Sequence, residues 1–130
     1  MAMEFPDDLK YTREHEWARA KGNRIVVGIT EFAQDQLGDI VYVELPDIGD
    51  AVKKGESFGV VESTKAVSEL FAPISGKVVE VNAPLSDAPE TVNEDPYEEG
   101  WMIAVEPSDP KDLQDLMDAK AYRAFVEEQE

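Results

Sequence analysis

Short runs of mainly apolar residues, separated by polar turns, recur along most of the chain, and this pattern predicts β-strands. β-branched and aromatic residues gather in these runs, and glycine, proline and asparagine separate them. The first two runs, 11–18 and 24–29, flank the turn Lys21-Gly22-Asn23 and are expected to pair as a hairpin. The later runs that are expected to form strands are 40–45, 57–62, 67–72, 77–81 and 101–105, with a long irregular loop over 86–100.

Helical spacing is confined to two parts of the chain. Thr30 can cap the N-terminus of a short helix over 31–37, and Gly38 can end that helix in the left-handed conformation. Near the C-terminus, helical spacing of apolar residues predicts a helix over 110–117, with a capping residue before it and a proline in its first turn. Asp118 can then cap a second short helix, so the sequence predicts a mostly β protein with a few helices.

The ends of the chain and an internal similarity indicate its organisation. Residues 1–9 show neither the strand pattern nor helical spacing and are expected to form a flexible leader. This leaves 10–130 as a single domain. The final residues, 127–130, are expected to fray. The segment 38–43 resembles 76–81, and each is followed, after turns, by a strand that an aromatic residue leads. One strand-rich half copied once would produce two facing sheets, although chance similarity between β segments is the alternative.

The balance of charge limits the partners. The chain carries 29 acidic and 12 basic residues, a formal net charge of −17. Such a charge opposes binding to nucleic-acid phosphates and to anionic membranes. It would favour association with basic partner surfaces, but it would serve equally well for solubility alone. No apolar run approaches the roughly 20 residues that a membrane-spanning helix needs.

Side chains for catalysis and metal binding are in short supply. There is no cysteine, and His15 is the only histidine. A structural role is expected for His15, because no nucleophile stands beside it in the sequence.

The N-terminus shows neither a signal peptide nor the arginine- and serine-rich pattern of a transit peptide. We therefore expect a monomer in a bacterial cytoplasm, with a processed mitochondrial form as the alternative.

A polar turn between two predicted strands contains a lysine whose amine could be modified covalently. Lys65 lies in Ser63-Thr64-Lys65-Ala66, between the runs 57–62 and 67–72. A side chain at such a position points into solvent and is open to a modifying enzyme. Acylation of its amine would remove the charge and produce a flexible arm. On spacing alone, however, an exposed lysine in a turn is more often a solvated side chain than a modified one.

Several motifs occur along the chain in a distinctive order. They are KYTREHEW (10–17), GIT (28–30), LGDIV (37–41), ELP (44–46), FGVVESTKA (58–66), PISGKVVEVN (73–82), VNEDPY (92–97) and GW (100–101). Together they resemble the H proteins of the glycine cleavage system, and the resemblance extends from about Lys10 to about Phe125. It implies a barrel-sandwich hybrid of two antiparallel sheets with a lipoyl-lysine in an exposed hairpin, which agrees with the independent strand pattern.

The resemblance also implies a carrier that catalyses no reaction itself. A PLP-dependent glycine decarboxylase would load an aminomethyl group onto the oxidised lipoyl group. An aminomethyltransferase would then release ammonia and pass the one-carbon unit to tetrahydrofolate. A flavin-dependent dihydrolipoyl dehydrogenase would reoxidise the resulting dithiol. Lipoic acid, which lipoylating enzymes would attach covalently to Lys65, is the expected cofactor.

The resemblance implies roles for a small set of residues. Lys65 matches the family's lipoylated lysine. Glu62, Glu69 and Gly76 match positions implicated in presenting the hairpin to the lipoylating enzyme. Glu16 matches an acidic residue near which the loaded arm folds back, where a carboxylate could hold the cationic aminomethyl amine and slow its loss to water. The alternative for Glu16 is a surface carboxylate beside core aromatic residues.

Other functions stay open at this point. Biotinyl carriers resemble one another in having methionine on both sides of the lysine, whereas Thr64 and Ala66 flank Lys65. The lipoyl domains of 2-oxo acid dehydrogenases typically sit in multidomain chains with Pro/Ala-rich linkers, and this sequence has no such linker. A relay protein that donates lipoate to other enzymes, and an enzyme built on Asp/Glu pairs, are the remaining alternatives.

Overall fold

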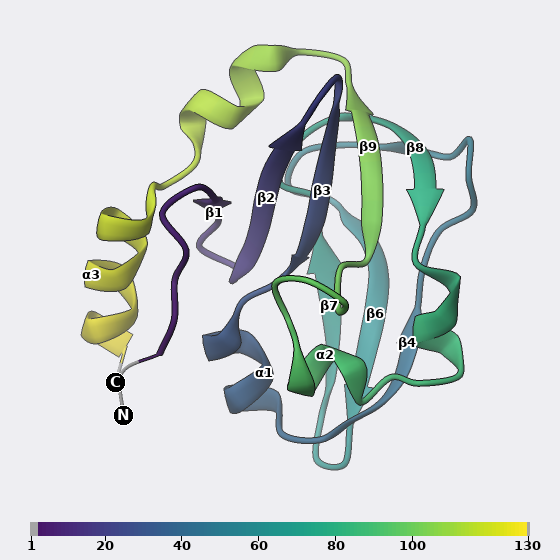
Figure 1. Ribbon diagram of the computed structural model, residues 1–130, viewed down its shortest axis with the longest axis vertical. Coiled ribbons are helices and arrows are strands. Elements are labelled where there is room, and N and C mark those ends of the chain that lie inside the picture. Colours follow the sequence, from purple (N-terminus) through teal and green to yellow (C-terminus); the bar gives the residue numbers. More distant parts are fainter. Residues whose placement is uncertain (1–2, 130) are drawn as a thin grey trace.

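Two antiparallel β-sheets form the body of the molecule (Figure 1). They are seen in a computed structural model that describes residues 3–129 of the chain. The larger sheet has six strands in the order β1-β2-β3-β9-β8-β5, and the smaller has three in the order β4-β6-β7. The strands are β1 (Lys10–Tyr11), β2 (Glu16–Lys21), β3 (Arg24–Ile29), β4 (Ile40–Glu44), β5 (Ala51–Val52), β6 (Ser57–Ser63), β7 (Val67–Phe71), β8 (Gly76–Val81) and β9 (Ile103–Pro107).

Short helices lie in the connections and at the C-terminal end. They are α1 (Glu31–Leu37), η1 (Ala83–Ser86), α2 (Thr91–Glu94), η2 (Pro110–Asp115) and α3 (Ala119–Gln129), where η denotes a 3₁₀ helix. The mostly β fold that the sequence predicts is therefore present. The two similar segments of the sequence lie in different sheets, one in β4 and the other in β8.

The first predicted strand is divided by a turn. The sequence predicts one strand over 11–18, but the chain bends between β1 and β2. The hydroxyl of Thr12 accepts hydrogen bonds from the backbone N–H groups of Glu14 (3.2 Å) and Glu16 (3.1 Å), which favours a local turn over a strand. His15 in this turn has a φ of 71°, in the left-handed region. β2 then pairs with β3, as the predicted hairpin requires.

The helix after this hairpin forms where the sequence predicts it. Thr30 precedes α1, and its hydroxyl accepts a hydrogen bond from the N–H of Ala33 at 3.1 Å. Gly38 ends the helix with a φ of 83°, which glycine adopts without strain. The chain then passes directly into β4, so the end of α1 and the start of the smaller sheet are joined by a very short turn.

The last strand and the loop before it differ from the prediction. The loop predicted over 86–100 contains the short helix α2, and β9 begins at Ile103 instead of Trp101. The side-chain amide of Asn82 donates hydrogen bonds to the carbonyls of Trp101 (2.7 Å) and Glu99 (2.9 Å). Backbone bonds with Val27 and Asn82 continue as far as Met102, but a side chain binds the carbonyls of Glu99 and Trp101, so the strand does not extend back to Trp101.

The segment after β9 also differs from the prediction. The sequence predicts a helix over 110–117, but only η2 is helical, and the chain beyond it is extended. Met117 forms two backbone hydrogen bonds with Tyr11, at 2.8 and 2.9 Å, beside β1. This antiparallel bridge needs an extended backbone, so tertiary pairing overrides the helical spacing. We call residues 115–117 the strap.

The C-terminal helix agrees with the prediction and is longer than expected. Asp118 caps α3 by accepting a hydrogen bond from the N–H of Ala121 at 2.8 Å. α3 continues through 127–129, which the sequence predicts to be frayed, while Glu130 lies outside the described residues.

The hydrophobic core has two parts. Between the sheets, aliphatic side chains such as Val27, Val61 and Val78 pack with no exposed surface. A separate cluster, mainly aromatic, joins α3 to β1, β2 and α1, and in it the rings of Tyr11 and Tyr122 stack at 4.6 Å. The buried members of this aromatic cluster are Phe5, Leu9, Tyr11, Trp17, Phe32, Tyr97, Ala119, Tyr122 and Val126.

The leader predicted over 1–9 packs against the domain in the part that the structure describes. Phe5 and Leu9 have only 6% and 1% of their surface exposed. The ring of Phe5 meets that of Tyr122 edge-on at 5.1 Å. Lone apolar residues in a polar segment carry no periodic signal, yet they become buried where a hydrophobic surface lies beside them. Residues 3–9 are therefore not the loose leader that the sequence predicts, and residues 1 and 2 lie outside the described chain.

Candidate functional site

Lys65 lies in the turn between β6 and β7, and this hairpin projects at the lower end of the molecule in Figure 1. Ser63 closes the turn: its hydroxyl accepts hydrogen bonds from the N–H groups of Lys65 (3.2 Å) and Ala66 (3.0 Å). The N–H of Ser63 donates to the carbonyl of Ala66 at 2.8 Å. The side chain of Lys65 is exposed and forms no ion pair with any described residue. Its amine is therefore open to a modifying enzyme.

Glu62 and Glu69 lie on the outward face of the three-stranded sheet, close to this tip. Val61 is fully buried, so its neighbour Glu62 points to the opposite, outward face of β6. Across the hairpin, Glu62 pairs with Val67 and Glu69 pairs with Val60. Within the described chain, neither carboxylate forms an ion pair. The structure thus brings both predicted carboxylates to one face.

Exposed apolar side chains accompany these carboxylates. Tyr42 in β4 pairs with Glu62 and keeps 45% of its surface exposed, and Val67 keeps 67%. Val41 is also exposed, because an irregularity in the register between Ile40 and Tyr42 turns two successive residues outward. Apolar side chains gathered on an exposed face are typical of a surface that another protein contacts.

Gly76 lies away from the hairpin. It begins β8 in the six-stranded sheet, and Figure 1 shows this end of β8 on the side of the molecule opposite the hairpin tip. A side chain at this position would overlap the carbonyl of Glu106 and the side chain of Val105. The close approach of β8 to β9 therefore requires a glycine here. The structure does not bring Gly76 together with Lys65.

Glu16 is buried, with 2% of its surface exposed, so it is not the surface carboxylate that the sequence leaves as an alternative. The hydroxyl of Thr12 donates to its Oε1 at 2.7 Å, and the N–H of Phe71 donates to its Oε2 at 3.2 Å. Burial raises the pKa of Glu16 to about 8, and these hydrogen bonds oppose the rise. The carboxyl group is therefore largely neutral at pH 7.

Glu16 lines a cleft of about 340 Å³, which we call the Glu16 cleft. Its walls come from the β1–β2 turn, the β5–β6 turn, the end of β7 and the strap. Lys54 and Asp115 form an ion pair at 3.0 Å that joins two of these walls. β7 connects the cleft with the hairpin, because Phe71 lines the cleft and Val67 adjoins the tip. These two residues are about 13 Å apart at the usual rise of a strand.

His15 contributes to the aromatic cluster. Its Nδ1 lies 2.8 Å from the hydroxyl of Tyr122, and its ring packs against Phe32 at 4.8 Å and Phe125 at 5.7 Å. The hydroxyl of Tyr122 also lies 2.8 Å from Oγ1 of Thr30, so the cap of α1 is tied to α3. Burial lowers the pKa of His15. These contacts agree with a structural role.

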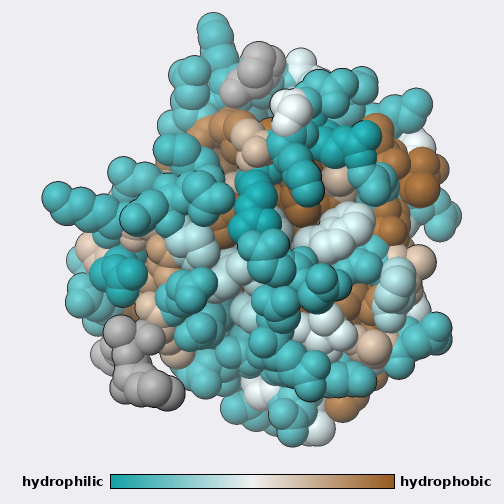
Figure 2. Space-filling model, viewed as in Figure 1, coloured by the Kyte–Doolittle hydropathy of each residue, from teal (hydrophilic) through white to brown (hydrophobic). Residues whose placement is uncertain are grey.

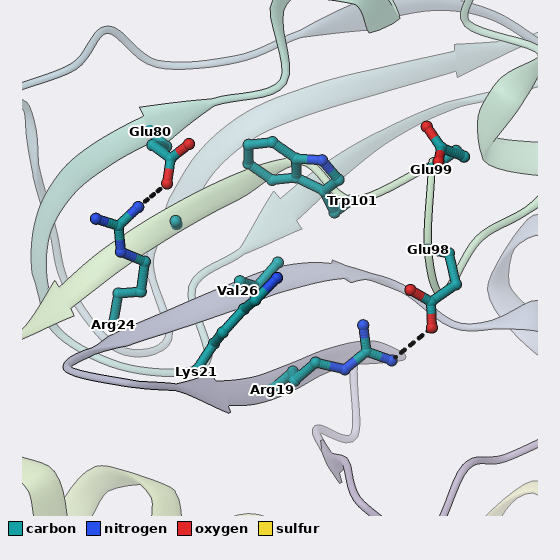
Figure 3. Close-up of a pocket in the computed structure, with 9 residues that line it drawn as sticks. Arg19, Lys21, Arg24, Val26, Glu80, Glu98, Glu99 and Trp101 are labelled. Atoms are coloured by element: carbon teal, nitrogen blue, oxygen red, sulfur yellow. Dashed lines mark hydrogen bonds and ion pairs between the residues drawn. The ribbon is translucent and has the colours of Figure 1, made fainter.

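A further depression, of about 410 Å³, lies on the outer face of the six-stranded sheet (Figure 3). Arg19 pairs with Glu98 at 3.3 Å, Arg24 pairs with Glu80, and the indole of Trp101 lies between the two pairs. The residues that line it include none of the predicted site residues. Since most of its charges pair with one another, the hairpin and the Glu16 cleft are the candidate functional site.

Comparison with known proteins identifies the family. The glycine cleavage H-protein family matches residues 9–129. The chain belongs to this family. The glycine cleavage system H protein of Anaeromyxobacter sp. (strain K) is 84% identical over 98% of this chain and 100% of its own length. The one from Myxococcus xanthus (strain DK1622) is 61% identical over 98% of each chain.

The H-protein family also supplies a solved structure for comparison. A crystal structure of a glycine cleavage system H protein from Mycobacterium marinum matches with a TM-score of 0.88 at 43% identity, covering 95% of this chain and 99% of that one. The expected barrel-sandwich hybrid is thereby confirmed. No helix formed by residues 3–129 is long and apolar enough to cross a membrane.

Two features of this H-family site were not predicted. The register irregularity in β4, which exposes Val41 and Tyr42, leaves no mark in the run of apolar residues from 40 to 45. The side chain of Asn93 in α2 reaches the turn before β4, which lies beside the hairpin. Asn93 belongs to one of the family motifs, but a motif alone does not say what its side chain contacts.

Proposed function

We propose that this chain is the lipoyl carrier of a glycine cleavage system, with lipoic acid in amide linkage to Lys65. The observation that carries the proposal is an exposed lysine at a hairpin tip, on a chain that belongs to the H-protein family. The residues present fit the group, because the Lys65 amine is exposed and has no ion-pair partner in the described chain. In this proposal the chain is a carrier and not an enzyme.

A bound lipoyl group would supply a disulfide that accepts an aminomethyl group and, after transfer, a dithiol that is reoxidised. The proposed partners are a PLP-dependent glycine decarboxylase, an aminomethyltransferase, dihydrolipoyl dehydrogenase and lipoylating enzymes. The contribution of this chain is to hold Lys65 on a firm hairpin from which an attached arm can reach several active sites. We place this monomeric carrier in a bacterial cytoplasm.

The surface of the molecule favours association with basic partner proteins. Figure 2 shows hydrophilic side chains over most of one face, and the chain has a net charge of −17. Glu62 and Glu69 are proposed to guide the lipoylating enzyme, because they are unpaired within the described chain and lie beside the tip. A contribution of Gly76 would have to act through the packing of β8 on β9.

Glu16 is proposed to hold the cationic amine of the loaded arm. Its carboxyl group is largely neutral while nothing occupies the cleft, since burial raises its pKa to about 8. A cation beside it would favour the charged form and lower this pKa, so that a charge-assisted hydrogen bond forms when the amine arrives. The apolar walls of the cleft, such as Phe71 and Leu116, would keep water from the bound group.

The direct test is the intact mass of the protein after expression with lipoate in a host that has working lipoylating enzymes. We expect a shift equal to one lipoyl group, and we expect Lys65→Ala to abolish it. Lys53→Ala is the matched control, because Lys53 is another exposed lysine in a turn and its loss should leave the shift intact. An unshifted wild type would overturn the proposal.

A further inference from the structure

The tip of the β6–β7 hairpin rests on the turn that joins α1 to β4. The N–H of Thr64 donates a hydrogen bond to the carbonyl of Asp39 at 3.1 Å. A Cβ atom at Gly38 would lie 3.3 Å from Cε of Lys65, so the stem of the lysine passes over this glycine. The segment 38–40, which we call the supporting turn, therefore touches both the backbone and the side chain at the modification site.

The supporting turn is itself held by Asn93 of α2. The side-chain carbonyl of Asn93 accepts a hydrogen bond from the N–H of Ile40 at 2.8 Å. Its amide group donates to the carbonyl of Gly38 at 2.8 Å and to the side chain of Gln34 at 2.9 Å. The two backbone bonds bracket Asp39, whose carbonyl receives the bond from the hairpin. No other standard side chain of this length offers an acceptor and two donors in one plane.

A chain of contacts thus runs from Asn93 to the lysine. We propose that Asn93 is a positioning residue for the modification of Lys65 and acts through the supporting turn. This inference rests on the proposed function, because it concerns the same modification. A lysine side chain has many rotamers, and a modifying enzyme needs the amine at one place in its active site. Because displacement of the tip adds to this spread of positions, it lowers the rate of lipoylation.

The two other connections of the tip do not replace this support. The bonds that Ser63 makes lie within the turn, so they fix its shape but not its place relative to the domain. The pairing of β6 with β7 ends at Glu62, and the pairing of β6 with β4 ends at Ser63, which faces Ile40 of the supporting turn. This pairing and the bond from Thr64 to Asp39 both connect the tip to the supporting turn, and through it to α1 and α2.

The experiment compares three proteins: wild type, Asn93→Ala and Gln34→Ala. Asn93→Ala removes all three bonds of Asn93. Gln34→Ala leaves both bonds to the supporting turn and removes the third, together with a local bond from Gln34 to the carbonyl of Glu31, so it serves as the matched control. Lipoylation is followed with a purified lipoate ligase, lipoate and ATP. Amide hydrogen exchange at Thr64 and the reaction of Lys65 with a small activated ester are measured on the same samples.

For Asn93→Ala we expect kcat/KM for lipoylation to fall on the order of tenfold, mainly through kcat, since the docking face around Glu62 and Glu69 is unchanged. The rate of amide hydrogen exchange at Thr64 should rise on the order of tenfold or more, while the exchange rates in β2 and β3 stay as in wild type. The activated ester should react with Lys65 at about the wild-type rate, because it senses exposure and not placement. Gln34→Ala should resemble wild type in all three measurements.

Each other result overturns the inference. An unchanged kcat/KM in Asn93→Ala removes the positioning role, and an unchanged exchange rate at Thr64 removes the chain of contacts. An equal fall in the enzymatic and the chemical reactions would show a loss of exposure instead of placement. If Asn93→Ala does not fold, Asn93→Asp replaces it. That variant keeps the acceptor for Ile40, but a carboxylate oxygen then faces the carbonyl of Gly38 in place of a donor, so kcat should still fall relative to wild type. If the wild type is not lipoylated, the proposed function itself is overturned. If the wild type is lipoylated and Asn93→Ala is lipoylated at the same rate, only the role of Asn93 is overturned.

Discussion

The turn that carries Lys65 is built from the consecutive residues 63–66, whereas the cleft that contains Glu16 is assembled from segments scattered between Tyr11 and Met117. The tip is exposed, and the hydroxyl of Ser63 within it accepts hydrogen bonds from its backbone N–H groups. The cleft buries a carboxyl group and shifts its pKa upward. In the proposed function, the first region carries the attached group and the second protects it when it is loaded.

Exposure and enclosure are produced by different kinds of contact. An exposed tip needs only local hydrogen bonds and two flanking strands. An enclosed carboxyl group needs walls from several parts of the chain, because a single segment cannot exclude water from both sides. β7 joins the two regions, since one end adjoins the tip and the other supplies Phe71 to the cleft. Variants at either end can therefore test one region while leaving the other intact.

The largest expected effect concerns the Glu16 cleft and pH. The pKa of Glu16 rises from 4.5 to about 8 on folding, because the carboxyl group is buried. The folded state then binds the proton more tightly than the unfolded state does. The resulting stabilisation is complete below about pH 4.5 and is lost as the pH rises to about 8.

Urea unfolding of wild type and Glu16→Gln measures this effect. Between about pH 4.5 and pH 8, the difference in the free energy of unfolding, wild type minus variant, should fall by about 1.4 kcal/mol per pH unit. Lys65→Ala, at the exposed tip, should follow the wild-type profile. Parallel profiles for wild type and Glu16→Gln would show that the carboxyl group is not held neutral by the fold.

The second effect concerns protection of the loaded arm. Glu16→Ala should still be lipoylated, but it should lose its aminomethyl group on the order of tenfold faster, since a hydrogen bond to a charged group contributes about 1.5–3 kcal/mol. The lifetime is read by intact mass after loading with glycine and the decarboxylase. Glu56→Ala, a change at an exposed glutamate that does not line the cleft, is the control. Equal lifetimes in the two variants would leave Glu16 without a protective role.

The third effect concerns the carboxylates beside the tip. Glu62→Gln and Glu69→Gln should each lower the rate of lipoylation by about two- to fivefold, because exposed charges at the edge of an interface contribute only modestly. The reduction should shrink as salt is added, which screens exposed charges. Glu56→Gln tests whether total charge alone is responsible, and a fall of the same size in this variant would remove the local role of Glu62 and Glu69.

The smallest effect concerns the contribution of Lys65 to stability. Lys65→Ala should change the free energy of unfolding by no more than about 0.5 kcal/mol, because the side chain is exposed and unpaired within the described chain. Urea unfolding at pH 7 checks this value. A loss well above 1 kcal/mol would mean that the contact between Lys65 and Gly38 stabilises the fold as well as placing the amine.

Most of the fold could be predicted from the sequence where the signal is local. The hairpin of β2 and β3, the cap of α1 at Thr30 and the cap of α3 at Asp118 all depend on neighbouring residues. Predictions failed where a distant partner decided the backbone. Met117 is extended because it pairs with Tyr11, and residues 3–9 are packed because Phe5 reaches Tyr122.

The strand-rich pattern, the excess of acidic residues and the lysine in a polar turn can all be read from the amino-acid sequence. Its motifs pointed to the H-protein family, to which the chain belongs. Three features emerge only from the folded chain: Glu16 is buried in a cleft, Gly76 lies apart from the hairpin, and Asn93 binds the turn under Lys65. The physical reason is that periodicity and turn chemistry act between near neighbours, whereas burial and hydrogen bonding join residues that are remote along the chain.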